Sequence, residues 1–205
     1  MKQVWQIDSE FKRLSVPLSP EEERKLENSL IRKGCMDPIA VWHGCILDGH
    51  KRYEICSYEE MDYKTVEMNF VSREDAIIWI CKKRVEESSA DKTIYKYLVG
   101  KWYNAEKTRI HAKRKEERRK SLDLAIEQKG EEGQLVSIPV NRISKVIAVQ
   151  ISMSYNSVES YGMLAKFLDE ISEKDEVFFT ALVENKIVVS FEKLRKLAQM
   201  DETKL

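Results

Sequence analysis

The sequence lacks the features that mark secreted and membrane-spanning proteins. No apolar run approaches the ~18 residues of a membrane span, and the N-terminal segment Met1–Phe11 carries Lys2, Asp8 and Glu10 instead of an apolar signal region. We therefore expect a cytoplasmic protein with no membrane partner. Lysines plus arginines equal aspartates plus glutamates at 35 each, so the net charge of zero gives no argument for nucleic acid. Any such argument has to come from the local distribution of charge.

Motifs for structural metals and for common ATPases are also missing. The four cysteines, at positions 35, 45, 56 and 81, include no Cys-x-x-Cys pair and lie near no His-x-x-x-His. Zinc sites usually draw their ligands from such spacings, so we expect no metal site and four buried, reduced thiols. The absence of a Gly-x-x-x-x-Gly-Lys-Ser/Thr motif excludes a Walker-type ATPase.

The first half of the chain predicts strands mixed with helices. Ser19, followed by Pro20 and Glu22, is typical of a capped helix start, and Gly34 is typical of a helix end. His43-Gly44 separates two short apolar runs in the manner of a hairpin turn. We expect strands over 4–7, 39–42, 45–47 and 66–70, with 66, 68 and 70 facing a core, and helices over 51–58 and from 73 onward.

The second half predicts helices only, and it contains the most basic segment of the chain. An apolar stripe at 94, 98, 102 and 105 indicates a long helix, and residues 101–120 hold nine lysines and arginines against three glutamates, about +6. Residues 129–133, Lys-Gly-Glu-Glu-Gly, are the best linker candidate. We therefore expect an N-terminal domain over 1–108, a basic helix and linker over 109–140, and a helical domain over 141–205.

Residues 144–164 have the spacing of a helix-turn-helix. Ala148 is the small residue at the helix crossing, Ser152 lies in the turn and Ser154 caps the second helix. The start of that helix is then exposed, with the DNA-binding candidates Tyr155, Asn156, Ser157 and Ser160 beside Glu159.

The same apolar spacing also fits a plain helical hairpin within a core, so the pattern by itself leaves both alternatives open. The neighbouring basic segment favours double-stranded DNA, because phosphate neutralisation needs cations beside the reading helix. The phosphate-contacting candidates are Lys113, Arg114, Lys115, Arg118 and Arg119.

Residues 46–53 predict a strand, a tight turn at Gly49 and a helix. Glycine lets a ligand approach the backbone, the helix start offers N–H groups to an anion, and His50, Lys51 and Arg52 add donors. We expect this loop to bind a phosphate-bearing ligand, either a nucleotide or a DNA backbone. Asp48 would repel phosphate unless it pairs with Arg52 or a divalent cation. The alternative is a hairpin followed by an ordinary solvated helix end.

Several of these segments together resemble ParB-like proteins of the ParB/sulfiredoxin superfamily. The resemblance covers about residues 16–200 and is most specific in its ordered combination, with a loop of the Asp-Gly-His-x-Arg-Tyr subgroup at 48–53. The other matching segments are 18–22, 37–42, 72–77, 98–103, 157–161 and 165–169.

The resemblance implies an α+β N-terminal ParB/sulfiredoxin-like domain with a small mixed sheet, followed by an all-α helix-turn-helix domain. It implies a DNA-binding protein of plasmid or chromosome partition, or of regulation in a mobile element. Whether the chain forms a homodimer stays open. The resemblance also implies a nucleoside triphosphate, CTP with Mg, at Gly49 and Arg52. His50 replaces the usual acidic residue, and residues 84–89 lack the family's Asn-x-x-Arg pair, so nucleotide use stays open.

Two other functions stay open beside DNA binding. Nucleases and nucleotide-dependent enzymes also use this scaffold, and the candidate acids and bases for them are Asp48, His50 and Glu22. Sulfiredoxin activity is not expected, because His50 stands where those enzymes place their catalytic cysteine. The third alternative is a protein-interaction module that binds no nucleotide.

Overall fold

The computed structural model describes residues 4–15, 17–88, 92–127 and 141–200, and the chain divides into two compact units, Met1–Ala90 and Asp91–Leu205. The predicted N-terminal domain over 1–108 ends inside one continuous helix, α5 (Thr93–Glu127). The apolar stripe of α5 is buried within the second unit. The expected linker over 129–133 lies outside the described residues.

The first unit contains a three-stranded mixed sheet of strand order β2-β1-β3. Strands β1 and β2 are antiparallel, with Val41 opposite Ile46, whereas β1 and β3 are parallel, with Ile39 opposite Thr65. The turn between β1 and β2 places His43 and Gly44 at positive φ, as a tight hairpin requires. The elements of this unit are α1 (Ser9–Arg13), α2 (Pro20–Lys33), β1 (Ile39–Trp42), β2 (Cys45–Asp48), α3 (His50–Tyr58), β3 (Thr65–Glu67) and α4 (Arg73–Glu87).

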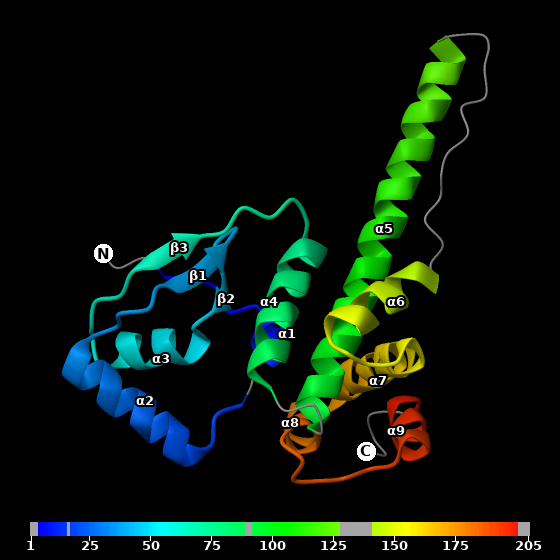
Figure 1. Ribbon diagram of the computed structural model, residues 1–205. Helices are drawn as coiled ribbons and strands as arrows, with labels where there is room; N and C mark the ends of the chain where they lie inside the picture. Colours follow the sequence, from blue (N-terminus) through cyan, green and yellow to red (C-terminus); the bar gives the residue numbers. More distant parts are fainter. Residues whose placement is uncertain (1–3, 16, 89–91, 128–140, 201–205) are drawn as a thin grey trace. The chain divides into compact units, whose positions relative to one another are not determined.

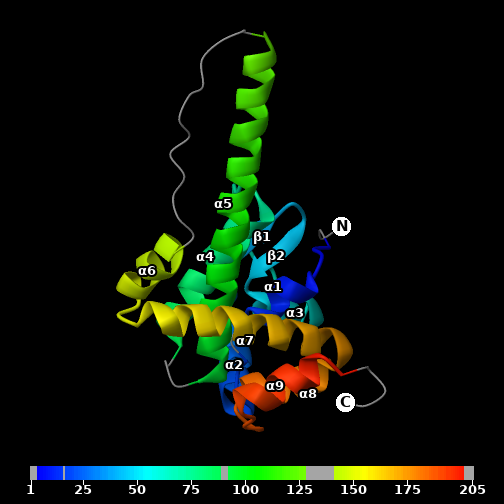
Figure 2. The same ribbon diagram turned by 90° about the vertical axis from the view of Figure 1, so that its right-hand side faces the viewer.

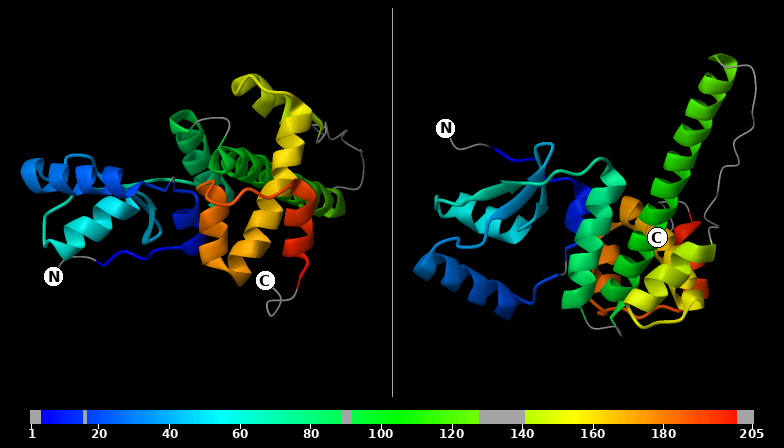
Figure 3. Two further views of the ribbon diagram at one scale, coloured as in Figure 1. Left: turned by 90° about the horizontal axis from the view of Figure 1, so that it is seen from below. Right: turned by 45° about the horizontal axis from the view of Figure 1, so that its top comes forward.

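Helices cover this sheet in layers. Helix α3 packs against β1, α2 packs against α3, and α1 and α4 both contact β2 (Figures 1 and 3). One apolar cluster gathers Ile39, Val41 and Ile46 from the sheet, and a second joins Leu30 of α2 to Cys56 of α3. The helix starts agree with the sequence, since Ser19 and Glu22 form a capping box.

Three details of the first unit differ from the sequence predictions. The segment over 4–7 forms only an isolated bridge, Gln6 to Cys45. Strand β3 ends at Glu67 and lies at the edge of the sheet. All three of its residues are exposed, and Val66, which was predicted to face a core, is 42% exposed. Cys45 is half-buried, whereas the other three cysteines are buried, and all four are free thiols.

The second unit is helical and is organised around α7, which packs against α5, α6, α8 and α9 (Figure 2). Side chains of Ser154, Asp175 and Ser190 cap α7, α8 and α9. None of the helices in the described ranges has the length and apolar character that a bilayer crossing requires. Beside α5, the elements are α6 (Asn141–Gln150), α7 (Tyr155–Lys174), α8 (Glu176–Val183) and α9 (Phe191–Ala198).

Two glycines allow α5 and α7 to cross closely. A Cβ on Gly100 would lie 1.9 Å from the backbone oxygen of Tyr161, and one on Gly162 would lie 2.5 Å from Cδ1 of Tyr103. Polar contacts fix the same interface. Tyr97 and Lys101 of α5 donate to the Asp169 carboxylate at 2.7 and 2.8 Å.

Replacing Gly100 with alanine should destabilise the second unit. Helix propensity alone favours alanine by about 1 kcal/mol, but the contact with the Tyr161 backbone forces the helices apart, so we expect a net loss of about 2 kcal/mol or more. Urea unfolding followed by far-UV circular dichroism measures this change. Thr108→Ala, at an exposed position of α5, is the control and should leave the midpoint nearly unchanged. Equal stability of Gly100→Ala and wild type would contradict the role of the close crossing.

Candidate functional sites

The first candidate site is the loop between β2 and α3. Strand β2 ends at Asp48, Gly49 takes a left-handed conformation with φ 89° and ψ 23°, and α3 begins at His50. The positive φ favours glycine here, and a Cβ would also lie 2.9 Å from Nη2 of Arg52, so the guanidinium would have to shift. The N–H groups of a helix's first turn have no partner within the helix, so this end of α3 can receive an anion.

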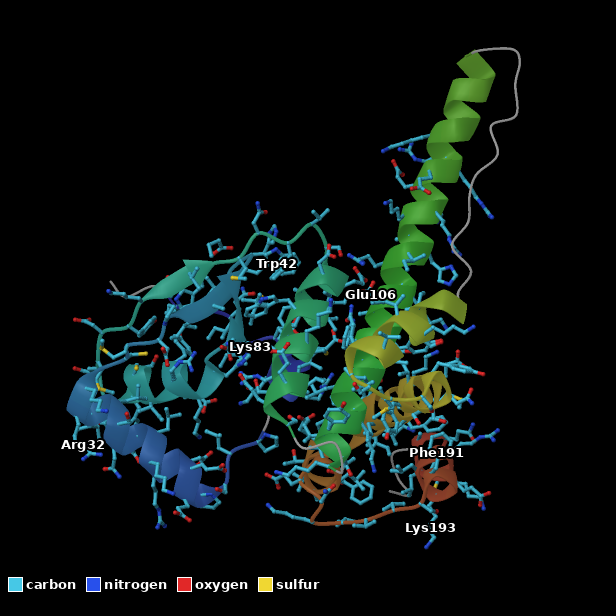
Figure 4. All side chains as sticks on the ribbon, in the orientation of Figure 1. Arg32, Trp42, Lys83, Glu106, Phe191 and Lys193 are labelled. Carbon is cyan, nitrogen blue, oxygen red and sulfur yellow. The ribbon has the colours of Figure 1, made fainter. Side chains whose placement is uncertain are left out.

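Asp48 is the most tightly bound group at this loop. Its side chain is buried, and its carboxylate accepts from Lys83 at 2.7 Å, from Arg52 at 3.5 Å and from Arg84. Lys83 and Arg84 come from α4, where Figure 4 labels Lys83. Arg52 also donates to the carbonyl oxygen of Pro38 at 3.4 Å. Three elements, β2, α3 and α4, therefore meet at one carboxylate.

These cations keep Asp48 ionised. Burial by itself raises the pKa of this carboxyl, but the charges of Arg84 and Lys83 outweigh burial, and the pKa lies below its ordinary value. Arg84 also pairs with Glu87 at 2.7 Å. Three positive charges (Arg52, Lys83 and Arg84) face two negative ones (Asp48 and Glu87), so the cluster has a net charge of +1.

His50 is a buried, neutral member of the same site. Its side chain is 5% exposed, and its Nδ1 lies 3.3 Å from the Ser15 hydroxyl. Burial lowers the pKa of His50 to about 4, although the charge of Asp48 acts to raise it, so the imidazole carries no charge at neutral pH. The other ring nitrogen, Nε2, is a buried polar atom that makes no hydrogen bond to the described residues.

The remaining predicted residues of this site have other contacts. Lys51 pairs with Glu23 at 3.1 Å and with Glu54 at 3.5 Å, so its ammonium group is held by neighbouring acids. Glu22 accepts from the backbone and hydroxyl of Ser19 in the capping box of α2. The structure thus brings together Asp48, Gly49, His50 and Arg52 from the predicted set.

Sequence reasoning missed Lys83 and Arg84. The only local signal was a run of basic residues near the end of α4, and cations are ordinary there because they complement the helix dipole. Their role depends on packing of α4 beside β2, which brings them to a residue 35 and 36 positions away in sequence.

The second candidate site is the start of α7 in the second unit. Helices α6 and α7 are joined by a tight turn, in which Ser152 has φ 53° and the N–H of Met153 donates to the carbonyl oxygen of Ala148 at 2.9 Å. Ala148, the small residue predicted at the helix crossing, is buried, and so is Val158. The Ser154 hydroxyl accepts from the N–H of Ser157 at 3.1 Å and thereby caps α7.

The predicted DNA-reading residues differ in their exposure. Tyr155, Asn156 and Ser160 are exposed, whereas Ser157 is half-buried and its hydroxyl is bonded to that of Ser154 at 2.9 Å. The sequence placed Glu159 on the exposed start of the helix, but its carboxylate accepts from the buried Ser144 hydroxyl at 2.9 Å. That bond ties α7 to α6.

Helix α5 carries the predicted basic segment on its second half. Every side chain from 108 to 120 is exposed or half-buried. Arg119 donates to Glu116 at 2.9 Å, and this bond lowers the pKa of Glu116 to about 2. Among the residues that the structure describes, no acid or other hydrogen-bond acceptor pairs with the cations Lys113, Arg114, Lys115 and Arg118.

Comparison with known proteins identifies the fold. No protein-family model and no curated protein matches this chain. A solved structure of a Pnob8-like ParB-N domain is similar, with 20% identity, a TM-score of 0.52, and coverage of 84% of this chain and 71% of that chain. The ParB-N-like fold with its small mixed sheet is therefore confirmed. The subgroup, the helix-turn-helix domain and both ligands stay predictions.

Neutral burial of His50 predicts a specific pH dependence of stability. Because the folded pKa of about 4 lies below the ordinary 6.5, the unfolded chain takes up a proton first as pH falls. The contribution of neutral His50 to the free energy of unfolding is fully present above about pH 6.5. It is lost progressively as the pH falls to about 4, by roughly 3 kcal/mol. His50→Asn keeps a polar partner for Ser15 but does not titrate, so this part of the pH dependence should disappear.

Urea unfolding of wild type and variant at pH 7 and pH 4.5 measures the effect of His50. His43→Asn is the matched control, because His43 is exposed at a positive φ that asparagine tolerates, and it should behave as wild type. An unchanged loss of stability at pH 4.5 in His50→Asn would show that other groups cause it.

Proposed function

We propose that this protein is a ParB-like protein that binds double-stranded DNA through its second unit, in partition of a plasmid or chromosome or in regulation of a mobile element. The observation that carries the proposal is the combination of an exposed, polar first turn of α7 with four exposed or half-buried cations on α5 that have no acid partner among the described residues. The ParB-N-like fold supports the assignment.

The start of α7 has the chemistry for reading base edges. In a helix-turn-helix the first residues of the second helix enter the major groove, and asparagine can bond two atoms of adenine there. Asn156 and Ser160 are exposed on that turn, and Tyr155 lies beneath the ammonium of Lys145 at 5.7 Å from its ring centroid. The hydrogen bond of Ser144 to Glu159 and the Ser154 cap hold this turn in place.

The α5 cations have the chemistry for the phosphate backbone. A lysine or arginine that faces water without an acid partner exchanges small counterions for phosphates when DNA binds, and the released ions favour association. Lys113, Lys115 and Arg118 are exposed and meet this condition, and Arg114 is half-buried with Nη2 unbonded in the described residues. Arg119 would first have to leave Glu116.

Neutralising three α5 cations should reduce the salt dependence of DNA binding. In the triple variant Lys113→Gln, Lys115→Gln, Arg118→Gln, the slope of log affinity against log salt should flatten by about 2–3 units, because each lost phosphate contact removes about 0.9. Fluorescence anisotropy with a labelled duplex over a series of salt concentrations measures the slope.

Two comparisons complete the DNA experiment. Neutralising Arg24, Lys25 and Arg32, which are exposed on α2, removes the same charge from the first unit and should leave the slope unchanged. Asn156→Ala should keep the slope while it weakens binding to the preferred sequence only. Equal slopes for the two triple variants would make the α5 segment an ordinary solvated helix.

We also propose that the Asp48–Arg52 loop binds the phosphates of a nucleotide. The specific observation in its favour is His50, which is almost fully buried at the start of α3 with Nε2 unbonded in the described residues, beside three cations. By resemblance the nucleotide is CTP. Magnesium is usually bound through substrate phosphates with one or two carboxylates, so we expect Mg²⁺ together with the triphosphate.

Arg52→Ala should weaken nucleotide binding at least about tenfold, because its guanidinium lies within the loop and can bond phosphate with two N–H groups. Isothermal titration with each of the four nucleoside triphosphates and magnesium measures the affinity. Lys51→Ala is the matched control, since Lys51 is held by Glu23 and Glu54, and its effect should be small. Binding that is the same in wild type and Arg52→Ala would exclude the loop as the phosphate site.

A further inference from the structure

The three cations at the Asp48–Arg52 loop already bind an anionic group of the protein itself, the Asp48 carboxylate. Asp48 is 4% exposed and uses both carboxylate oxygens, Oδ1 for Arg84 and Oδ2 for Lys83 at 2.7 Å and Arg52 at 3.5 Å. Guanidinium and ammonium groups are the donors that a phosphate oxygen would also use. A ligand at this loop therefore meets donors that are engaged before it arrives.

The three cations differ in how tightly they pair with Asp48. Arg52 Nη2 has long contacts, 3.5 Å to Asp48 and 3.4 Å to the Pro38 carbonyl oxygen, and its Nε is buried without a partner in the described residues. The Lys83 side chain is 42% exposed, so its ammonium group can turn from Asp48 toward water without being desolvated itself. The arrangement allows Arg52 and Lys83 to move from the carboxylate to an incoming anion while Arg84 keeps Asp48 paired.

We propose that the Asp48 carboxylate competes with phosphate for Arg52 and Lys83. Because of this competition, the Asp48–Arg52 loop accepts polyphosphate and rejects singly charged or small anions. This inference rests on the proposed phosphate-binding function of the loop. With Asp48 in place the cluster has a net charge of +1, and without it +2. Only an anion with several negative charges gains enough from Arg52 and Lys83 to compensate for their separation from Asp48.

The alternative is that the cations serve Asp48 and no ligand. A buried carboxylate needs such partners for stability alone, and removing its charge would then only leave the half-buried cations Arg52, Lys83 and Arg84 without it. The two explanations differ in what an added anion does when the carboxylate is absent. If Asp48 competes with phosphate, then phosphate replaces it.

Titration of wild type and Asp48→Asn with inorganic pyrophosphate and with inorganic phosphate tests the proposal. Asparagine keeps the shape of the side chain and removes its charge. We expect pyrophosphate to bind Asp48→Asn about tenfold more tightly than wild type. We also expect the ratio of the affinities for pyrophosphate and phosphate to be smaller in the variant. Glu59→Gln removes one exposed carboxylate at the other end of α3 and should leave both affinities unchanged. Further titrations with CTP and magnesium and with a DNA duplex separate the two sources of phosphate.

Unfolding measurements keep the test decisive if Asp48→Asn folds poorly. Pyrophosphate should raise the thermal midpoint of the variant more than that of wild type, because the anion takes the place of the lost charge. A variant that stays unfolded at saturating pyrophosphate, or that gains no more than wild type, would overturn the proposal.

The experiment also separates the two levels of inference. If neither wild type nor Asp48→Asn binds pyrophosphate, CTP or DNA at the loop, the proposed phosphate site is wrong. The proposed competition by Asp48 is then wrong as well. If wild type binds and Arg52→Ala weakens binding, but Asp48→Asn binds no more tightly, the site stands and only the role of Asp48 is wrong.

Discussion

The charge of one buried carboxylate, Asp48, constrains the part of the first unit that contains the loop between β2 and α3. An ionised Asp48 at 4% exposure would be costly without partners, and its partners come from two helices, so α3 and α4 must both lie against the end of β2. Gly49 then has to reverse the chain at positive φ to bring Arg52 back to the same carboxylate. The loop geometry and the position of α4 are both tied to this arrangement, whereas burial keeps His50 neutral against the charge of Asp48.

The second unit depends on a different constraint, the close approach of two backbones. Gly100 and Gly162 let α5 and α7 touch, and once they do, Tyr97 and Lys101 reach Asp169. Because α7 also packs against α6, α8 and α9, most of its length serves the core. Its first turn differs, because Tyr155 and Asn156 there are exposed and lie outside the core.

The two candidate sites, in a chain with no net charge, place their cations in different surroundings. On α5 the cations are exposed, and several have no acid partner among the described residues, so their effect on a polyanion extends into solvent and depends on salt. At the loop the cations surround a buried carboxylate, so their interactions are short-range and little screened. The first arrangement suits a long duplex, and the second suits a compact group with several charges.

Sequence signals of short range were sufficient for many of the structural elements. The capping box at Ser19, the hairpin at His43 and Gly44, the helix start after Ser72 and the α6–α7 turn all depend on residues within a few positions of one another. The turn at Gly49 and the pairing of Asp48 with Arg52 were predictable for the same reason, since they lie four residues apart.

Tertiary structure alone decided the features that depend on distant residues. Lys83 and Arg84 joined the loop because α4 packs against β2, and His50 became neutral because the surrounding elements bury it. The apolar stripe of α5 is buried against α7, and α5 therefore belongs to the second compact unit. Local propensity and periodicity act over a few residues, whereas desolvation, ion pairing and helix crossing depend on which faces meet after folding.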